Sequence, residues 1–433
     1  MRTLILGTSL RGLVDAARIS LDEGAEVLMY DAEVNEPPPD LANRVTVLPT
    51  NWRSEYLVDV DRVITSPWFP QTEPPISDVL RKGVDVITEA GFGLEHTAIP
   101  FVGITGTNGK TTVTELVTEM LTASGVRAVA AGNLGEPVSG LVGIDSDIDA
   151  DILILELSSY QLRFLGNVVP RGAALLNIAP DHLDWHGTFD EYVAAKSRIF
   201  HKMTEDSILV YNVDDETVVR VVGGAPCTLV PCSGSDIPPG GNGVAEGLIV
   251  IDGHEFSTPT SDPSFLLDLV VAGTLAAAFG ADADGIGRTI ANFVPGAHRR
   301  QLIETSDGIV WIDDSKATNP HATSAAVAAH APVVLLAGGQ NKGLDLSIIG
   351  NLDGVTNLIA FGEAGGVIGG TASAEVTIVE SLEAAVEHAR NVASVGDTVL
   401  LSPGCASFDE FASYAERGDE FRRLVKRTEE SAA

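Results

Sequence analysis

Short apolar runs alternate with segments of helix length along most of this chain. The first run covers residues 3–6 and is followed by a glycine loop, a helix-length segment to about residue 23, and the run EVLMYD at 26–31. Strands buried in parallel sheets are apolar runs of this length, and the helices between them are crossovers. The pattern therefore predicts an α/β protein with parallel sheets.

The alternation begins again twice further along the chain. A second block opens with IPFVGIT at 99–105, and its residues 220–262 carry the Gly, Pro and Ser clusters typical of a β-rich excursion. A third block opens with VPGAHRR at 294–300 and contains the strand candidates VWIDD, PVVLLAGG, NLIAFG, VTIVE and TVLLSPG. A chain of 433 residues is too long for one core. We predict three domains: a Rossmann-like N-terminal domain at 1–97, a central phosphate-loop domain at 98–295 and a Rossmann-like C-terminal domain at 296–433.

Acidic residues dominate the charged positions. The chain has 27 Lys and Arg residues against 60 Asp and Glu residues, a formal net charge of −33. This field repels nucleic acid and anionic lipid, so we expect neither as a partner. The apolar fraction of 45% excludes a disordered chain. We expect an acidic, halophilic-type protein, in which salt screens the self-repulsion.

Cysteine usage and hydropathy place the protein in the cytoplasm. Three cysteines, Cys227, Cys232 and Cys405, cannot all pair and form no CxxC, so neither a disulfide framework nor a zinc site is predicted. The sequence shows neither a secretory signal nor an uninterrupted run of 18 apolar residues. We expect a cytoplasmic monomer with small-molecule partners.

Lysine is scarce, which makes each lysine a stronger functional candidate than usual. The chain has Lys82, Lys110, Lys196, Lys202, Lys316, Lys342 and Lys426 and no others.

The stretch GITGTNGKTT at 103–112 is a candidate phosphate loop. Its glycines stand at 103, 106 and 109, whereas the usual pattern would place its first glycine where Ile104 stands. A strand precedes the loop, and a helix begins near Thr111. Backbone N–H groups, Lys110 and the helix N-terminus would hold phosphate, and the Thr111 hydroxyl would bind Mg²⁺. The alternative, a glycine-rich turn, explains neither this context nor the lysine.

Three further residues are candidates for metal chemistry. Glu156 ends an apolar strand in the block of the phosphate loop, where Mg²⁺ needs an oxygen ligand. His182 lies in PDHLDWHG, a motif that fits metal ligands, acid–base groups or structural residues equally. Lys196, in the helix-length segment EYVAAKSRIF, is selected only by the scarcity of lysine.

Polar loops follow three strands of the last block. They are IDDSKATNP at 312–320, AGGQNKG at 337–343 and LLSPGCASFDEF at 400–411. Ligands of α/β proteins bind at the carboxyl ends of strands, so we expect one shared crevice. The first loop, GTSLRG at 7–12, with Asp31 after the second strand, is a weak dinucleotide signal.

In this order the motifs resemble those of the Mur ligases, most closely the branch that adds D-glutamate to UDP-N-acetylmuramoyl-L-alanine. GITGTNGKTT is that family's form of the phosphate loop. It is followed in family order by GNLG, ELSSYQL, NIAPDHLDWHG, HRR-Q, DDSKATNP, AGGxxKG and LSPGCASFDEFASYAERG. The last motif is diagnostic of the D-glutamate branch. The resemblance spans about residues 100–433, and the first domain matches in outline.

The resemblance implies an ATP-dependent amide ligase that activates a carboxylate as an acyl phosphate. Catalysis would involve Lys110, His182 and Lys196. One Mg²⁺ would be held by Thr111 and Glu156, and a second by His182 and a carbamylated Lys196. ATP would contact Gly103, Gly106, Thr107, Asn108, Gly109, Lys110, Thr111, Thr112, Arg299, Asp314 and also Asp268, which stands in place of the family's adenine-binding His-Asn pair.

The same resemblance implies two further sets of contacts. The acceptor would meet Leu10, Arg11, Asp31, Asn133, Ser158 and Gln161. The incoming amino acid would meet Lys316, Thr318, Lys342, Ser407, Phe408 and Tyr414.

Four alternatives remain open at this point. The first is the same chemistry on a non-muramic cell-envelope or cofactor precursor. A folate-polyglutamate type of ligase fits less well, because its loop usually ends in GKGS. A phosphate-loop ATPase without ligation, or a non-catalytic binding module, would leave the lysine-bearing loops of the last block without a role.

Overall fold

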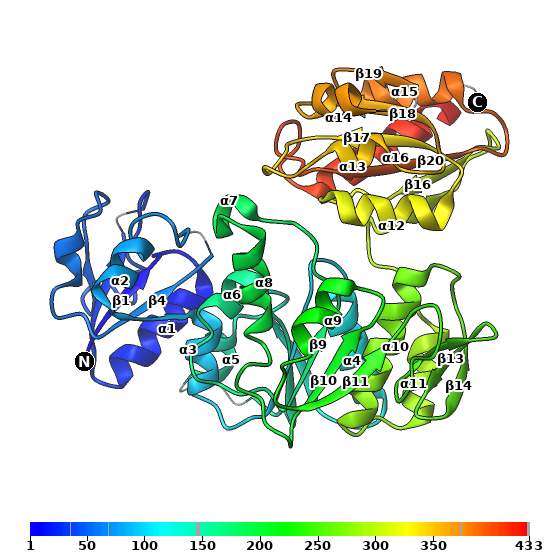
Figure 1. Cartoon of the computed structure of the whole chain (residues 1–433). Coiled ribbons are helices and arrows are strands. Elements are labelled where there is room, and N and C mark those ends of the chain that lie inside the picture. Colours follow the sequence, from blue (N-terminus) through cyan, green and yellow to red (C-terminus); the bar gives the residue numbers. More distant parts are fainter. Residues whose placement is uncertain (35, 68, 144–147, 373–374, 431–433) are drawn as a thin grey trace. The chain divides into compact units, whose positions relative to one another are not determined.

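The computed structural model describes residues 1–34, 36–67, 69–143, 148–372 and 375–430 (Figure 1). They form two compact units. The first contains Met1–Ile178, Trp185–Thr260 and Leu266–Asn292; the second contains Ala179–Asp184, Ser261–Phe265 and Phe293–Ala433. The predicted boundaries after residues 97 and 295 stay a prediction.

The first unit begins with a parallel five-stranded sheet in the order β3-β2-β1-β4-β5. Its strands are β1 (Arg2–Leu6), β2 (Glu26–Tyr30), β3 (Thr46–Val47), β4 (Arg62–Thr65) and β5 (Asp85–Thr88). The associated helices are α1 (Arg11–Asp22), the 3₁₀ helix η1 (Ser54–Leu57), α2 (Ile76–Lys82) and α3 (Glu89–Glu95). The central strand β1 has four consecutive buried residues, as expected of a strand covered on both faces.

A second parallel sheet of the same unit has the order β11-β10-β9-β6-β8-β7. Its strands are β6 (Phe101–Thr105), β7 (Ala128–Gly132), β8 (Ile152–Glu156), β9 (Gly172–Leu175), β10 (Ile208–Asn212) and β11 (Thr228–Cys232). The antiparallel strands β12 (Gly243–Ala245), β13 (Leu248–Ile251) and β14 (His254–Ser257) form the predicted β-rich excursion.

Helices fill the connections of this middle part of the chain. They are α4 (Lys110–Ala123), α5 (Val138–Val142), α6 (Ser159–Arg163), α7 (Leu183–His186), α8 (Phe189–Ser197), α9 (Glu216–Val222), α10 (Pro263–Ala278) and α11 (Ala283–Ala291).

The second unit is built on a six-stranded sheet in the order β15-β16-β20-β17-β18-β19. Its strands are β15 (Gln301–Ile303), β16 (Val310–Asp313), β17 (Val333–Gly338), β18 (Val355–Phe361), β19 (Val376–Ile378) and β20 (Thr398–Gly404). The five predicted strands of this block are confirmed and pair in parallel. The antiparallel edge strand β15 was not predicted, because three residues are too short to form a recognisable apolar run.

Helices cover both faces of this sheet. They are α12 (Pro320–His330), α13 (Ser347–Gly350), α14 (Gly365–Thr371), α15 (Leu382–Val392) and α16 (Tyr414–Glu430). Trp311 belongs to the apolar cluster under α15 and α16, whereas its neighbour Ile312 belongs to the cluster under α12, α13 and α14. Successive side chains of a strand point to opposite faces, so β16 feeds both cores. The predicted α/β fold with parallel sheets is confirmed.

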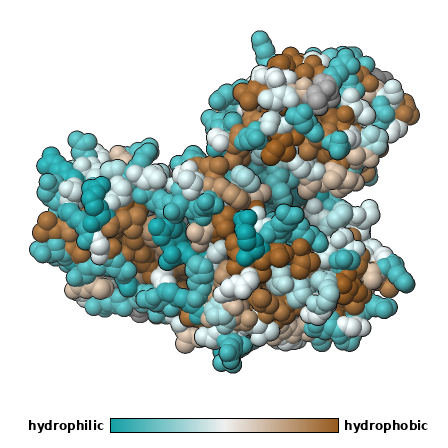
Figure 2. Space-filling view, in the orientation of Figure 1, coloured by the Kyte–Doolittle hydropathy of each residue, from teal (hydrophilic) through white to brown (hydrophobic). Residues whose placement is uncertain are grey.

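The surface in Figure 2 mixes hydrophilic with apolar side chains. Within the described parts of the chain, every helix is too short or too polar to cross a bilayer.

Gly338→Ala tests how closely β17 and β18 approach. Gly338 has a φ of 155°, and a Cβ there would lie 2.0 Å from the carbonyl oxygen of Phe361. We expect the substitution to lower the free energy of unfolding by about 2 kcal/mol or more, measured by denaturant titration. Gly366→Ala is the matched control, because this helical position of α14 has open space around a Cβ. The control should be neutral or slightly stabilising; equal effects of the two substitutions would contradict the close approach.

Candidate active site

The phosphate loop joins the end of β6 to the start of α4, as predicted. Lys110 donates from Nζ to the carbonyl oxygens of Gly106 and Thr107, each at 3.0 Å. The loop is held from β9, because the backbone of Asn177 accepts from Thr107 N at 2.9 Å and its side chain accepts from Asn108 N at 2.8 Å. Asn177 was not predicted from the sequence; a polar residue two positions after a buried strand was the available signal.

The three glycines of the loop have different reasons to be glycine. Gly109 caps α4 with a φ of 86°, and a Cβ there would lie 2.6 Å from Oδ1 of Asp268. A Cβ on Gly106 would lie 2.9 Å from the side chain of Leu176. Gly103 instead lies inside β6, where a Cβ would meet Ile199 and Leu157 at 3.1 Å. The unusual spacing of the motif thus includes a packing glycine of the strand, and its contact with ATP stays a prediction.

Glu156 ends β8 and has an unsatisfied oxygen. Its Oε1 accepts from Asn133 Nδ2 at 2.8 Å, whereas its buried Oε2 has no hydrogen-bond partner among the described residues. A buried carboxylate oxygen without a donor is a fitting ligand for a hard cation. The described residues contain no group of three or more His, Cys, Asp and Glu side chains that would hold a metal by themselves. A cation at Glu156 would therefore need other ligands, such as the Thr111 hydroxyl or phosphate oxygens.

Lys196 lies against the phosphate loop. It belongs to α8, is 1% exposed, and donates from Nζ to the carbonyl oxygen of Gly106 at 2.6 Å. The ring of Tyr192 lies 4.8 Å from this Nζ, and the Tyr192 hydroxyl is 3.0 Å from Thr107 Oγ1. The helix thus brings Lys196 and Tyr192 to the loop, although only the lysine was selected from the sequence.

Ser158 and Gln161 form a capping box at the start of α6. Ser158 donates from both N and Oγ to Gln161 Oε1 at 2.9 Å, and Gln161 N donates back to Ser158 Oγ. This arrangement satisfies the helix terminus. It gives both side chains a structural role, and their predicted contact with the acceptor stays a prediction.

The first sheet carries the other residues predicted to bind the acceptor. Asp31 Oδ2 accepts from Thr8 N and Oγ1, and its Oδ1 accepts from the backbone of Glu33 and Val34. Burial raises the pKa of Asp31, but these hydrogen bonds outweigh it and hold the pKa below its usual range. Asp31 therefore ties the loop after β1 to the loop after β2. Leu10 precedes α1 and is partly exposed, and the exposed Arg11 pairs with Glu136 at 2.6 Å.

His182 belongs to the second unit, whereas Thr111, Glu156 and Lys196 belong to the first. Its neighbour Asp181 accepts from Asn319 Nδ2 at 3.2 Å and lies 3.5 Å from Lys342 Nζ. Asp181 thereby attaches residues 180–184 to two polar loops of the second unit. Whether His182 shares a metal with Lys196 stays a prediction.

The second unit brings the predicted ATP and amino-acid residues of the last block to the carboxyl ends of its strands. Asp314 follows β16 and accepts from Ser402 Oγ at 2.8 Å and from Arg300 N at 3.2 Å. Burial raises the pKa of Asp314 to about 7, against these hydrogen bonds and the charge of Arg300. Lys316 Nζ lies 3.7 Å from the centre of the Tyr414 ring. The remaining predicted residues are the partly exposed Arg299 and Thr318, the buried Ser407 and the 67% exposed Phe408.

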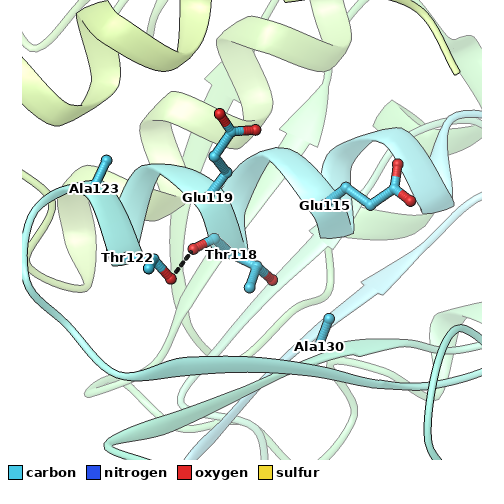
Figure 3. Close-up of a pocket in the computed structure, with 6 residues that line it drawn as sticks. All are labelled: Glu115, Thr118, Glu119, Thr122, Ala123 and Ala130. Atoms are coloured by element: carbon cyan, nitrogen blue, oxygen red, sulfur yellow. Dashed lines mark hydrogen bonds between the residues drawn. The ribbon is translucent and has the colours of Figure 1, made fainter.

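A separate hollow lies between α4 and β7 (Figure 3). It has a volume of about 490 Å³ and is lined by Glu115, Thr118, Glu119, Thr122, Ala123 and Ala130. None of these residues was predicted for the site, and the side chains on α4 belong to the helix beyond its first turn.

The chain matches two family models and has relatives of similar length. The model of the Mur ligase middle domain matches residues 104–235, and that of the Mur ligase glutamate ligase domain matches residues 298–405. The chain is 36% identical to the UDP-N-acetylmuramoylalanine–D-glutamate ligase of Syntrophotalea carbinolica, covering 98% of this chain and 97% of the relative. It is 35% identical to the enzyme of the same name from Rubrobacter xylanophilus, covering 98% of both chains.

Solved structures show the same fold at low identity. A pseudomurein peptide ligase type C from Methanothermus fervidus matches with a TM-score of 0.62 and 18% identity, over 99% of both chains. The MurF ligase from Thermotoga maritima in complex with ADP matches with a TM-score of 0.61 and 17% identity, over 94% of this chain and 96% of that one.

Asp314→Asn tests the raised pKa of this buried carboxyl. The pKa in the folded chain, about 7, exceeds the 3.8 of an ordinary aspartate, so the folded state binds the proton more tightly. The resulting stability is present at low pH and is lost as the pH rises through the folded pKa. Between pH 4 and 7 the unsubstituted chain should lose up to about 1.4 kcal/mol of unfolding free energy per pH unit relative to Asp314→Asn.

Asp307→Asn is the control for this pH series. Burial raises the pKa of Asp307, but hydrogen bonds from Ile309, Thr305 and Trp311 outweigh it and hold the pKa below its usual range. This control should therefore show no such slope above pH 4. Parallel stability curves for Asp314→Asn and the unsubstituted chain would contradict the raised pKa.

Proposed function

Since the chain belongs to the Mur ligase family, we propose that it joins D-glutamate to the carboxylate of UDP-N-acetylmuramoyl-L-alanine at the expense of ATP. Membership makes it an ATP- and Mg²⁺-dependent amide ligase with small-molecule substrates. The observation that carries the choice of substrates is the similarity to D-glutamate ligases over 98% of the chain. That span includes the first sheet, where the acceptor would bind.

The reaction needs an activated carboxylate, because a free carboxylate repels an attacking amine. A carboxylate oxygen of the acceptor attacks the γ-phosphorus of ATP, the bond to ADP breaks, and an acyl phosphate forms. The amino nitrogen of D-glutamate then attacks the acyl carbon, phosphate leaves with the bonding electrons, and the nitrogen loses a proton. Both steps are favoured by positioning and by offsetting the charge on the phosphoryl group.

The phosphate loop supplies that offset from its own residues. The N–H groups at the start of α4 would hold the anion, and Lys110 is held at the loop by two carbonyl oxygens. Thr111 and the unsatisfied Oε2 of Glu156 would hold Mg²⁺. Mg²⁺ bound there neutralises charge on the triphosphate.

Lys196 is proposed to act as a carbamate in a second Mg²⁺ site with His182. Its Nζ donates to the carbonyl oxygen of Gly106 in the phosphate loop, which supports a role at the phosphates. Carbamylation would replace a cation by an anionic oxygen ligand, which Mg²⁺ prefers.

Two lysines suit a dicarboxylic amino acid. Lys316 and Lys342 lie on loops at the carboxyl ends of β16 and β17, two strands that flank β20 in the same sheet. D-glutamate has two carboxylates, and one ammonium for each would explain a preference over amino acids with a neutral side chain. Thr318, Ser407, Phe408 and Tyr414 would complete the subsite.

Release of ADP tests the proposed reaction. Nucleotide-sugar peptides and simpler carboxylic acids are crossed against D- and L-amino acids, at low and high salt. We expect ADP release to require both UDP-N-acetylmuramoyl-L-alanine and D-glutamate for sustained turnover. Lys110→Ala should lower kcat by about 100-fold or more, because it removes a charge that stabilises the transferring phosphoryl group. Lys426→Ala, at an exposed lysine of α16, should leave kcat unchanged; turnover indifferent to every amino acid would instead indicate an ATPase.

Rescue by small carboxylates tests the role of Lys196. Lys196→Ala should be inactive in plain buffer and should regain part of its activity when formate or acetate is added, because the added oxygen ligand replaces the carbamate. Lys110→Ala, measured beside it, should not respond. Full activity of Lys196→Ala without any addition would exclude the role.

A further inference from the structure

Arg417, in the first turn of α16, uses all five of its N–H groups. Its Nε donates to Ser315 Oγ at 3.0 Å, and its Nη2 donates to Ser315 O at 2.9 Å and Cys405 O at 3.1 Å. Its Nη1 donates to Cys405 O and Ala406 O, each at 3.1 Å. A guanidinium has five N–H donors in a rigid fork, so every donor has a partner.

These bonds join two loops that end neighbouring strands. Ser315 stands between Asp314 and Lys316 after β16, and Cys405 and Ala406 directly precede Ser407 after β20. Arg417 therefore fixes the backbone next to two residues proposed to hold the amino acid. The Ser315 hydroxyl closes the arrangement by donating to Tyr414 O at 2.7 Å, at the start of the same helix.

Two neighbours of Arg417 act on Lys316 as well. The ring of Tyr414 lies beneath the Lys316 ammonium at 3.7 Å. On the other side of Arg417, Gly418 makes room for the imidazole of His298, because a Cβ there would lie 2.1 Å from Nδ1. His298 in turn accepts from Lys316 N at 3.0 Å. The start of α16 thus supports the Lys316 loop in two ways. The Tyr414 ring contacts the Lys316 side chain, and His298, which packs against Gly418, accepts from the Lys316 backbone.

A buried cation is a costly way to fill space. Arg417 is 0% exposed, and all its hydrogen-bond partners are neutral oxygens. Burial lowers the pKa of its guanidinium to about 10, so the group stays charged at neutral pH. An apolar side chain would fill the same volume without the desolvation cost, but it would remove the donors of Ser315 O and Cys405 O, whereas Ala406 O would keep the N–H of Gln340. We therefore explain the buried Arg417 by the positions in which its hydrogen bonds hold the two loops.

We propose that Arg417 is a positioning residue for the amino-acid step, which orients the loops of Lys316 and Ser407 towards one substrate. The inference rests on the proposed function and names a residue for its second step. The ATP side of the same loop has its own support, because Asp314 is held by Ser402 Oγ and Arg300 N. Loss of the Arg417 fork should therefore impair amino-acid binding more than formation of the acyl phosphate.

Arg417→Lys and Ser315→Ala test this asymmetry. Arg417→Lys keeps the positive charge but reduces the five N–H donors to three. Ser315→Ala removes the hydroxyl that accepts from Arg417 Nε and leaves the guanidinium in place. We expect the KM for D-glutamate to rise about tenfold in Arg417→Lys and about threefold in Ser315→Ala. The ADP formed in a single turnover from ATP and acceptor, without amino acid, should change less than about twofold. Arg423→Lys is the matched control on the same helix. Arg423 is exposed, and its ion-pair partner among the described residues is Glu420.

Amide hydrogen exchange gives a second readout that does not depend on the substrate. Residues 314–317 and 404–407 should exchange faster in both variants, while the strands β17 and β18 should not change. If D-glutamate has no effect on the turnover of the unsubstituted chain, the proposed function is wrong. Faster exchange in the two variants would still show that Arg417 orders these loops.

Other outcomes would overturn the inference. Folded variants with unchanged KM and unchanged exchange would exclude any positioning role. An equal loss in the single turnover and in the amino-acid step would make Arg417 a general structural residue. If Arg417→Lys does not fold, Ser315→Ala decides by the same criteria.

Discussion

Every substrate of the proposed reaction is an anion, and the chain that binds them has a formal net charge of −33. This electrostatic constraint explains how the site is built. Attraction cannot come from the whole surface, so it must come from groups placed within a few ångströms of each ligand, where distant charges are screened. Backbone N–H groups at the phosphate loop and single lysines on α4, α8 and two loops of the second unit are the groups proposed to supply it. Carbonyl groups contact the ammonium groups of Lys110 and Lys196, the Tyr414 ring contacts that of Lys316, and the carboxylate of Asp181 lies near that of Lys342.

The sequence was informative where a feature is local. Apolar runs of strand length predicted strands in each of the three parallel sheets, among them β1, β6 and β16, and the glycine loop predicted the start of α4. Strands β3, β7 and β10 were not predicted. Strand β15 was not predicted either, because it forms by pairing with β16 and has no recognisable apolar pattern of its own. The contribution of Asn177 escaped for a similar reason, since β9 and β6 are neighbours in space but not in sequence.

Some side chains that were predicted to bind ligands form hydrogen bonds within the fold. Ser158 and Gln161 satisfy one helix terminus, and both oxygens of Asp31 are occupied by two loops. A motif shared within a family does not separate these tasks, because a residue that orders a loop and a residue that touches a ligand are retained alike. Side chains that are far apart in the sequence also pair within one unit. Asp262 pairs with Arg300 within the second unit, although it lies more than 30 residues before the third block begins.

The scarcity of lysine has a practical side. Amine-reactive labels and amine coupling to sensor chips normally modify many harmless surface lysines. In this chain Lys110, Lys196, Lys316 and Lys342 are four of only seven, and Lys82 and Lys202 donate to backbone carbonyl groups. Lys196 is buried, so a dye or a chip attached through amines would fall disproportionately on Lys110, Lys316 and Lys342, which are proposed to bind ligands. Coupling through the abundant carboxylates is the better handle for measuring binding to this protein.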